Sequence, residues 1–372
     1  MNELQVSGQS LTLHRFPANA ADPSLQAWDS ADEYLLQQPL PEGPVLVLND
    51  NFGALACALH PREVWQVSDS WISQQATLHN FATNELPVGN VRFLDSLAPL
   101  PSGMAAVLIK IPKTLALLEF QLQALREVIT ADTLVIAAAK AKDIHRSTLE
   151  LFEKWIGDTH TSLAWKKSRL VFTKLTVTAP STNSQHLLSW PLEGTPYTVH
   201  NHANVFARQS LDIGARLFLQ HLPSQLEGTI VDLGCGNGVV GLLALEQNPD
   251  AKVHFVDESW MAVASSQLNV EKNLPGSLAR CEFTVNNSLS GFTGGSLQSV
   301  LCNPPFHQQS AITDHIAWQM FRDAKRCLSY GGELRVVGNR HLDYHRKLKK
   351  LFGNCQLIAS DSRFVVLRAV KL

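Results

Sequence analysis

Two short segments in the second half of the sequence carry the residue types most able to do chemistry. One is Asn303-Pro304-Pro305-Phe306, which follows the apolar run Val300-Leu301-Cys302, and the other is the glycine-rich segment from Asp232 to Gly238. Each is preceded by a predicted buried strand. Doubly wound α/β sheets bind ligands at the carboxyl ends of their strands, so we expect both segments at one edge of one sheet.

The Asn-Pro-Pro-Phe segment suits a reaction at an amino nitrogen. Two prolines fix the backbone and remove two N–H donors, which leaves local carbonyl groups able to accept hydrogen bonds from a ligand. If the Asn303 side-chain oxygen and the Pro304 carbonyl each accept one N–H of an exocyclic amine, such as that of guanine, its lone pair can be aimed at a methyl donor. Phe306 can stack on the base. We therefore predict amino methylation driven by positioning; a rigid turn is the alternative. The predicted catalytic residues are Asn303, Pro304, Pro305 and Phe306.

The glycine-rich segment predicts a loop that lets a ligand approach the backbone. Its glycines run G-x-G-x-G rather than the G-x-G-x-x-G of pyrophosphate-binding loops, which favours S-adenosylmethionine. Asp232 is placed to reach the methionine ammonium group, and Asp257, ending the next strand, can accept both ribose hydroxyls with its two oxygens. A tight turn without a ligand is the alternative. The predicted cofactor-binding residues here are Asp232, Gly234, Cys235, Gly236, Asn237, Gly238 and Asp257.

Asn286 and Asn287 follow a further predicted strand of the same sheet. They stand at the edge where such sheets bind ligands, and one of them could hydrogen-bond the amino group of adenine. An asparagine pair that serves only turn geometry is the alternative.

The elements around these segments alternate between strand and helix. A strand from Thr229, the glycine loop, a helix over Val239 to Gln247 and a strand ending at Asp257 form a βαβ unit. The fold class is therefore α/β, with a mostly parallel twisted sheet and an antiparallel closing hairpin. Further strands are predicted at Glu282 to Val285, Ser299 to Cys302 and Glu333 to Val337, and the hairpin at Gln356 to Ala359 and Phe364 to Val370.

The N-terminal half repeats this order. Gln66 to Trp71 echoes Phe255 to Trp260, and Leu151 to Gly157 matches Leu348 to Gly353. We therefore predict two tandem Rossmann-like domains of the class I methyltransferase type, residues 1–185 and 186–372, joined by the polar stretch Ala179 to Gln185.

The two copies differ where the chemistry is expected. Asn49 to Gly53 stands where the second copy has Gly234 to Gly238, and Lys110 to Lys113 stands roughly where it has Asn303 to Phe306. The first copy is therefore predicted to be degenerate, with a structural and RNA-binding role, and the second to be catalytic.

Composition places the chain among ordinary globular proteins. It has 372 residues, 45% of them hydrophobic and 17% charged, which suits two cores. The start lacks the pattern of a signal peptide and no apolar run approaches the roughly 20 residues of a membrane helix, so we expect a cytoplasmic protein. The six cysteines show no metal-ligand spacing, and we expect neither a metal nor a disulfide.

The formal net charge of −2 requires any RNA-binding surface to be a local basic patch. A solvated helix face is the alternative for each basic run. The best candidate is Arg340 to Lys350, and the smaller ones are Lys140, Lys142 and Arg146, and Lys166, Lys167 and Arg169.

The two motifs, with the run Leu211 to Arg216, resemble those of the bacterial ribosomal RNA guanine-N2 methyltransferases with duplicated methyltransferase domains. The resemblance covers essentially the whole chain. Leu11 to Pro17 and His200 to Phe206 are most similar to the members that act on the large-subunit 23S RNA. The resemblance implies S-adenosylmethionine as methyl donor, 23S ribosomal RNA as partner, guanine N2 as acceptor and catalysis by the second domain. It adds three residues that would flank the cofactor: Phe206, Asp212 and Gly214.

Other functions fit part of the pattern. The RNA could be 16S, or the substrate could be a glutamine amide of a protein, because release-factor methyltransferases use a similar Asn-Pro-Pro motif with Tyr in place of Phe306. DNA adenine methylation is disfavoured because no separate base-reading domain is predicted. An inactive RNA-binding ribosome assembly factor is disfavoured because both motifs of the second copy are intact.

Overall fold

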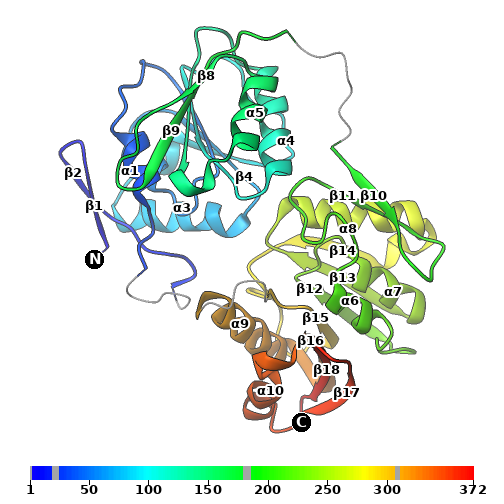
Figure 1. Ribbon diagram of the computed structural model, residues 1–372. Coiled ribbons are helices and arrows are strands. Elements are labelled where there is room, and N and C mark those ends of the chain that lie inside the picture. Colours follow the sequence, from blue (N-terminus) through cyan, green and yellow to red (C-terminus); the bar gives the residue numbers. More distant parts are fainter. Residues whose placement is uncertain (1, 19–24, 179–185, 306–310) are drawn as a thin grey trace. The chain divides into compact units, whose positions relative to one another are not determined.

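The computed structural model describes residues 2–18, 25–178, 186–305 and 311–372. The chain forms two compact units, residues 1–186 and 187–372, and each is described on its own. Each unit holds a seven-stranded sheet with helices packed on both faces (Figure 1).

The first unit opens with a β-hairpin and continues into a sheet of order β5-β4-β3-β6-β7-β9-β8. Strands β3 to β7 pair in parallel, whereas β9 pairs antiparallel with β7 and β8. The strands are β1 (Glu3–Val6), β2 (Gln9–Thr12), β3 (Val45–Leu48), β4 (Val64–Ser68), β5 (Val91–Asp95), β6 (Ala106–Lys110), β7 (Leu134–Lys140), β8 (Thr159–Thr161) and β9 (Ser168–Thr173). The α-helices are α1 (Ser30–Leu36), α2 (Ala54–Leu59), α3 (Trp71–Thr83), α4 (Leu115–Arg126) and α5 (Arg146–Trp155).

The second unit has the same plan, with the sheet order β14-β13-β12-β15-β16-β18-β17. Its strands are β10 (Leu188–Pro191), β11 (Thr198–Asn201), β12 (Gly228–Leu233), β13 (Ala251–Asp257), β14 (Cys281–Val285), β15 (Leu297–Cys302), β16 (Leu328–Asn339), β17 (Gln356–Ser360) and β18 (Phe364–Val370). The α-helices are α6 (Ile213–Leu219), α7 (Val239–Gln247), α8 (Trp260–Asn273), α9 (Ala311–Cys327) and α10 (Tyr344–Phe352).

Both faces of each sheet are buried, which explains why the central strands are almost wholly apolar. In β3, Val45 and Val47 pack with α1 and α2, whereas Leu46 and Leu48 pack with α4 and α5. In the second unit, α6, α7 and α8 cover one face and α9 and α10 the other (Figure 1). The helices leave the loops at the carboxyl ends of the strands available for a ligand site.

The two units correspond residue by residue at this edge. Gly53 and Gly238 each begin the helix after the first strand of their sheet, with φ values of 86° and 82°. The pairings β3–β6 and β12–β15 place Lys110 and Asn303 at equivalent positions, next to Ile109 and Cys302. The predicted fold class, with two α/β sheets that each close on an antiparallel hairpin, is confirmed.

Candidate active site

The glycine loop joins β12 to α7. Gly238 has a φ of 82°, and a Cβ on it would lie 3.0 Å from the Cα of Ser266, so only glycine fits this close to α8. Gly236 also has a positive φ, 54°, but no heavy atom lies within 4 Å of the position its Cβ would take. The loop is therefore packed against the protein at Gly238 and open at Gly236, where a ligand can approach the backbone.

Asp232 is buried beneath the loop. Its side chain is 3% exposed, and its Oδ2 accepts a hydrogen bond of 2.8 Å from the Gly241 backbone N–H in the first turn of α7. Burial raises the pKa of Asp232 to about 8, and the nearby Asp257 adds to the increase. The structure gives Asp232 a role in holding the start of α7, and its contact with a methionine ammonium group stays a prediction.

Asp257 ties the glycine loop to the loop after β13. Its Oδ2 accepts a hydrogen bond of 2.9 Å from Gly236 N–H, and its Oδ1 accepts one of 2.9 Å from Ser259 N–H. These two bonds orient the carboxylate at the end of β13, and its two oxygens match the two hydroxyls of a ribose. This geometry agrees with the predicted ribose contact, which stays a prediction.

Cys235 and Asn237 have buried side chains that hold the loop from within. The Ser266 hydroxyl donates to the Cys235 sulfur at 3.2 Å, and burial raises the pKa of the thiol well above its ordinary value. Asn237 Nδ2 donates to Asn201 Oδ1 at 3.0 Å, while Asn269 Nδ2 donates to the Asn237 carbonyl at 2.8 Å. A ligand would therefore meet these two residues through their backbone.

The asparagine pair lies directly after β14, at the same edge of the sheet. Asn286 Nδ2 donates to the Ser288 and Ser290 carbonyls at 3.0 and 2.8 Å, so this side chain shapes the turn. Asn287 Oδ1 accepts a bond of 3.0 Å from Gln319 Nε2 on α9, a partner that the sequence pattern did not indicate. An adenine contact for either asparagine stays a prediction.

Asn303 follows β15, two strand spacings along the edge from β13. Its Nδ2 donates to Asp212 Oδ2 at 3.3 Å, whereas its Oδ1 is buried and has no hydrogen-bond partner among the described residues. Pro304 is buried and Pro305 is exposed. A buried acceptor without a partner costs free energy, so this oxygen is suited to receive an N–H from a ligand. Phe306, predicted to stack on the base, lies outside the described residues.

The three residues that the resemblance added lie near the start of α6 or before it. Asp212 is the N-cap of α6, with its Oδ2 accepting the Ala215 N–H at 3.0 Å. A Cβ on Gly214 would lie 3.2 Å from that oxygen and from the Phe364 ring, so glycine leaves room for the carboxylate. Phe206 is 49% exposed. Their contact with a cofactor stays a prediction, while the bond between Asp212 and Asn303 was not anticipated.

The same positions are filled differently in the first unit. Lys110, which corresponds to Asn303, is buried, and its Nζ lies 2.9 Å from Asp29 Oδ1 and 3.0 Å from Asp32 Oδ2. Burial alone would lower the pKa of Lys110, but Asp32 and Asp29 hold it above its ordinary value. Asp50, which corresponds to Cys235, accepts the Ala56 N–H at 3.0 Å. The first unit thus has an ion pair at the strand end where the second unit has Asn303 Oδ1, an acceptor without a hydrogen-bond partner among the described residues.

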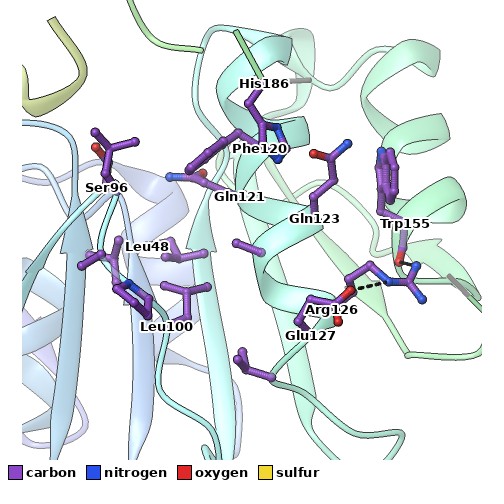
Figure 2. Close-up of a pocket in the computed structure, with 16 residues that line it drawn as sticks. Leu48, Ser96, Leu100, Phe120, Gln121, Gln123, Arg126, Glu127, Trp155 and His186 are labelled. Atoms are coloured by element: carbon purple, nitrogen blue, oxygen red, sulfur yellow. Dashed lines mark hydrogen bonds and ion pairs between the residues drawn. The ribbon is translucent and has the colours of Figure 1, made fainter. Parts of the chain in front are cut away.

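A cavity of about 560 Å³ lies elsewhere in the first unit, between the sheet, the segment 96–100 and α4 (Figure 2). Phe120 and His186 meet at one end of it, with ring centroids 4.8 Å apart. Two of its polar side chains already have protein partners: Gln121 bonds Asn49, and Arg126 donates to the Trp155 carbonyl. The cavity is lined by residues of the first unit and is separate from the candidate active site.

The sheet order of the second unit, the glycine loop after its first central strand and the Asn-Pro-Pro segment at the neighbouring strand end define a Rossmann-like methyltransferase. The family model "RLMG N-terminal domain" matches residues 1–177, and "Methyltransferase small domain" matches residues 196–368. The chain belongs to the family of ribosomal RNA large subunit methyltransferase G.

Relatives of that name cover the whole chain. Those of Erwinia tasmaniensis and Klebsiella pneumoniae subsp. pneumoniae are 64% and 63% identical, over 100% of this chain and 100% and 99% of their own. The relative of Serratia proteamaculans is 60% identical, over 100% of this chain and 99% of its own. The T. thermophilus 16S rRNA N2 methyltransferase RsmC, solved with AdoMet and guanosine, superposes with a TM-score of 0.78 at 21% identity, over 100% of this chain and 97% of that one. This last likeness shows the fold.

Within the described ranges, no helix is long and apolar enough to cross a membrane. In the same ranges, no group of three or more His, Cys, Asp or Glu side chains is arranged to hold a metal ion.

Proposed function

We propose that this protein methylates the exocyclic N2 of a guanine in 23S ribosomal RNA, with S-adenosylmethionine as the methyl donor. The observation that carries the proposal is the buried Asn303 Oδ1 without a partner, at the sheet edge that also presents the open glycine loop. An amino group is a donor that such an acceptor can bind. The name shared by the curated relatives supports a ribosomal RNA of the large subunit as the substrate, and with it a cytoplasmic site of action.

The residues of the second unit fit S-adenosylmethionine as a ligand. The backbone is open at Gly236, and Asp257 is held by two backbone N–H groups beside it. When bound, the cofactor supplies an electrophilic methyl group. The glycine spacing G-x-G-x-G differs from the G-x-G-x-x-G of pyrophosphate-binding loops, which favours a ligand without a pyrophosphate.

The chain's own residues act on the guanine amine by positioning it. Asn303 Oδ1 accepts one N–H and the Pro304 carbonyl accepts the other, so that the nitrogen lone pair points toward the methyl donor. Holding two reactants in line in this way lowers the barrier without a covalent intermediate. After the transfer the nitrogen carries a positive charge and readily releases one proton to water, so no strong general base is required.

For the first unit we propose a bracing and RNA-binding role. Lys140 and Lys142 lie on one surface with the second small cluster, because Lys140 pairs with Ser168 across the sheet and Ala141 N–H donates to the Lys167 carbonyl at 2.8 Å. Arg146, the third residue of the first cluster, pairs with Glu150 on α5. Trp165 stands beside them, with Lys166 Nζ 4.7 Å from its ring centroid and 3.4 Å from Glu33 Oε2. Exposed cations around an aromatic ring suit a single-stranded nucleic acid. We name this surface the basic edge; it consists of Lys140, Lys142, Trp165, Lys166, Lys167 and Arg169.

The test is transfer of labelled methyl from S-adenosylmethionine to ribosomal RNA from cells that lack the protein, followed by mass spectrometry of the nucleosides. We expect N2-methylguanosine in the 23S fraction. Label in the 16S fraction would move the substrate to the small-subunit RNA. No label in any RNA, despite cofactor binding, would overturn the proposal in favour of a protein amide substrate or an inactive assembly factor.

A further inference from the structure

Asp212 is the partner that orients the Asn303 side chain. The two residues are 91 positions apart in the sequence, yet Asn303 Nδ2 donates to Asp212 Oδ2 at 3.3 Å. A carboxylate can only accept hydrogen bonds. The amide must therefore present its nitrogen to Asp212, and its Oδ1 is left on the other side, buried and without a partner in the described part of the chain.

Asp212 is itself held in place by the backbone. As the N-cap of α6 it accepts the Ala215 N–H at 3.0 Å with the same Oδ2 that receives Asn303. Gly214 leaves space beside that oxygen, where a Cβ would lie at 3.2 Å. The carboxylate is thus fixed before any substrate arrives, as preorganised positioning requires.

The first unit supports this assignment independently. Its α1 has an aspartate N-cap, Asp29, at the position of Asp212, and the Asp29 carboxylate binds the residue that corresponds to Asn303, namely Lys110. In both units, then, the aspartate that caps the helix before the sheet binds the side chain at the end of a central strand. In the second unit Asp212 binds the Asn303 nitrogen and leaves its oxygen without a partner. In the first unit Asp29 neutralises the Lys110 ammonium.

We propose that Asp212 is a positioning residue for methyl transfer, acting through the orientation of the Asn303 amide rather than by flanking the cofactor. This inference rests on the proposed function. Without an acceptor at residue 212 within reach, nothing would hold Nδ2 on this side, and the Asn303 amide could turn Nδ2, a donor, toward the N–H donors of the substrate amine. An asparagine at 212 keeps such an acceptor, because its Oδ1 can take the place of Oδ2 and accept from both Ala215 N–H and Asn303 Nδ2.

The test compares wild type with Asp212→Asn, Asp212→Ser and Asn303→Asp in single-turnover methyl transfer to the RNA. Asn and Ser both preserve an N-cap, so the fold and cofactor affinity should be retained. The Asp212→Asn variant keeps an oxygen that can accept from Asn303 Nδ2, whereas the serine side chain of Asp212→Ser is one bond shorter, and Asn303→Asp has no donor for Asp212. We expect Asp212→Ser and Asn303→Asp to lose about 10²-fold in rate and Asp212→Asn to stay within about tenfold of wild type, a difference that loss of a cap alone would not produce.

The outcomes separate this inference from the proposed function. If wild type transfers no methyl group to ribosomal RNA, the proposed function fails. If wild type is active but Asp212→Ser keeps its rate, or Asp212→Asn is as slow as Asp212→Ser, the positioning role is overturned. A rate loss in Asp212→Ser that only follows a lower folded fraction, measured by thermal unfolding, would overturn it as well.

Discussion

At the scale of single residues, Asn303 and Lys110 show how one side chain decides what a strand end can do. Both stand at equivalent ends of a central strand, and both contact an aspartate that caps the helix before the first strand of the sheet, α1 or α6. The amide leaves an acceptor without a partner, whereas the ammonium is paired with two carboxylates. Binding of an amine at this edge therefore requires a side chain with two different ends: a nitrogen whose hydrogen bond to the protein fixes it, and an oxygen left available to the ligand.

Replacing Asn303 with Ala should leave the fold and the affinity for S-adenosylmethionine unchanged while the methyl-transfer rate falls by about 10²–10³-fold. The reason is that one of the two acceptors for the amine is removed. Single-turnover transfer and calorimetric cofactor binding measure the two effects separately. As a control, Asn273→Ala removes an amide that bonds Thr198 and the Asn269 carbonyl and should keep full activity. An Asn303→Ala protein with the wild-type rate would refute the assigned mechanism.

Asp232 should make the stability of the second unit depend on pH. Its folded pKa of about 8 exceeds the value of about 3.9 expected for an unfolded chain. The folded state therefore binds the extra proton, and stability is lost as pH rises from about 4 through about 8. Asp232→Asn keeps an acceptor for Gly241 N–H and removes this loss, which amounts to at most about 1.4 kcal/mol per pH unit. Urea unfolding of both proteins at several pH values measures the difference, and parallel pH profiles would show that Asp232 does not titrate in this range.

At the scale of elements, the glycine loop has two parts: Gly238 is packed against α8, whereas the backbone at Gly236 is open to a ligand. Gly236→Ala should cost about 1–2 kcal/mol of stability because of its positive φ, and should weaken cofactor binding because the methyl group enters the open space. Gly331→Ala is a matched control, since Gly331 also has a positive φ, 82°, and an open Cβ position, but belongs to β16. We expect a similar stability loss in both variants and weaker S-adenosylmethionine binding, measured by calorimetry, in Gly236→Ala alone. Equal cofactor affinity in the two variants would place the ligand elsewhere.

The sheet strands and the closing hairpin of the second unit could be predicted because hydrophobic periodicity and turn residues report them directly. The helix predicted over Val239–Gln247 has those bounds, and the last hairpin differs from the prediction by one residue, at Ser360. The strand predicted at Glu333 to Val337 is longer, Leu328–Asn339, and the hairpins β1–β2 and β10–β11 were not predicted. The site was less predictable. The motifs indicated which residues gather at the edge, but not the direction of each side chain, so the burial of Asp232 and the bond from Gln319 to Asn287 were not foreseen. The contact between Asp212 and Asn303 joins residues 91 positions apart, which no local pattern reports.

At the scale of the whole molecule, the net charge of −2 concentrates any RNA affinity in patches such as the basic edge. The other candidate, Arg340 to Lys350, forms α10 with Tyr344, Leu348 and Phe352 buried, and Lys347 pairs with Asp314. One face of this helix therefore packs against the protein, and only its remaining basic residues are available to an RNA.

Replacing Lys166, Lys167 and Arg169 with Glu should weaken RNA binding. It should also make the negative slope of log affinity against log salt shallower by about 3, because about one phosphate contact is lost per residue. Cofactor affinity should not change. Reversal of the exposed Lys252, Lys272 and Arg363 makes the same change in net charge away from the basic edge and should have a smaller effect. Filter binding at several salt concentrations measures both triple variants; unchanged RNA binding in the first would remove these residues from the proposed surface.

The ion pair of the first unit also limits which substitutions its strand end tolerates one at a time. With Lys110 seated between Asp29 and Asp32, replacing the lysine alone leaves an ionised Asp32 buried without its cation, a loss of about 3–5 kcal/mol. Placing glycines in the loop alone leaves the ammonium at the strand end. Giving this end the arrangement of the second unit would therefore need several substitutions together, so the ion pair itself holds the first unit in its present form.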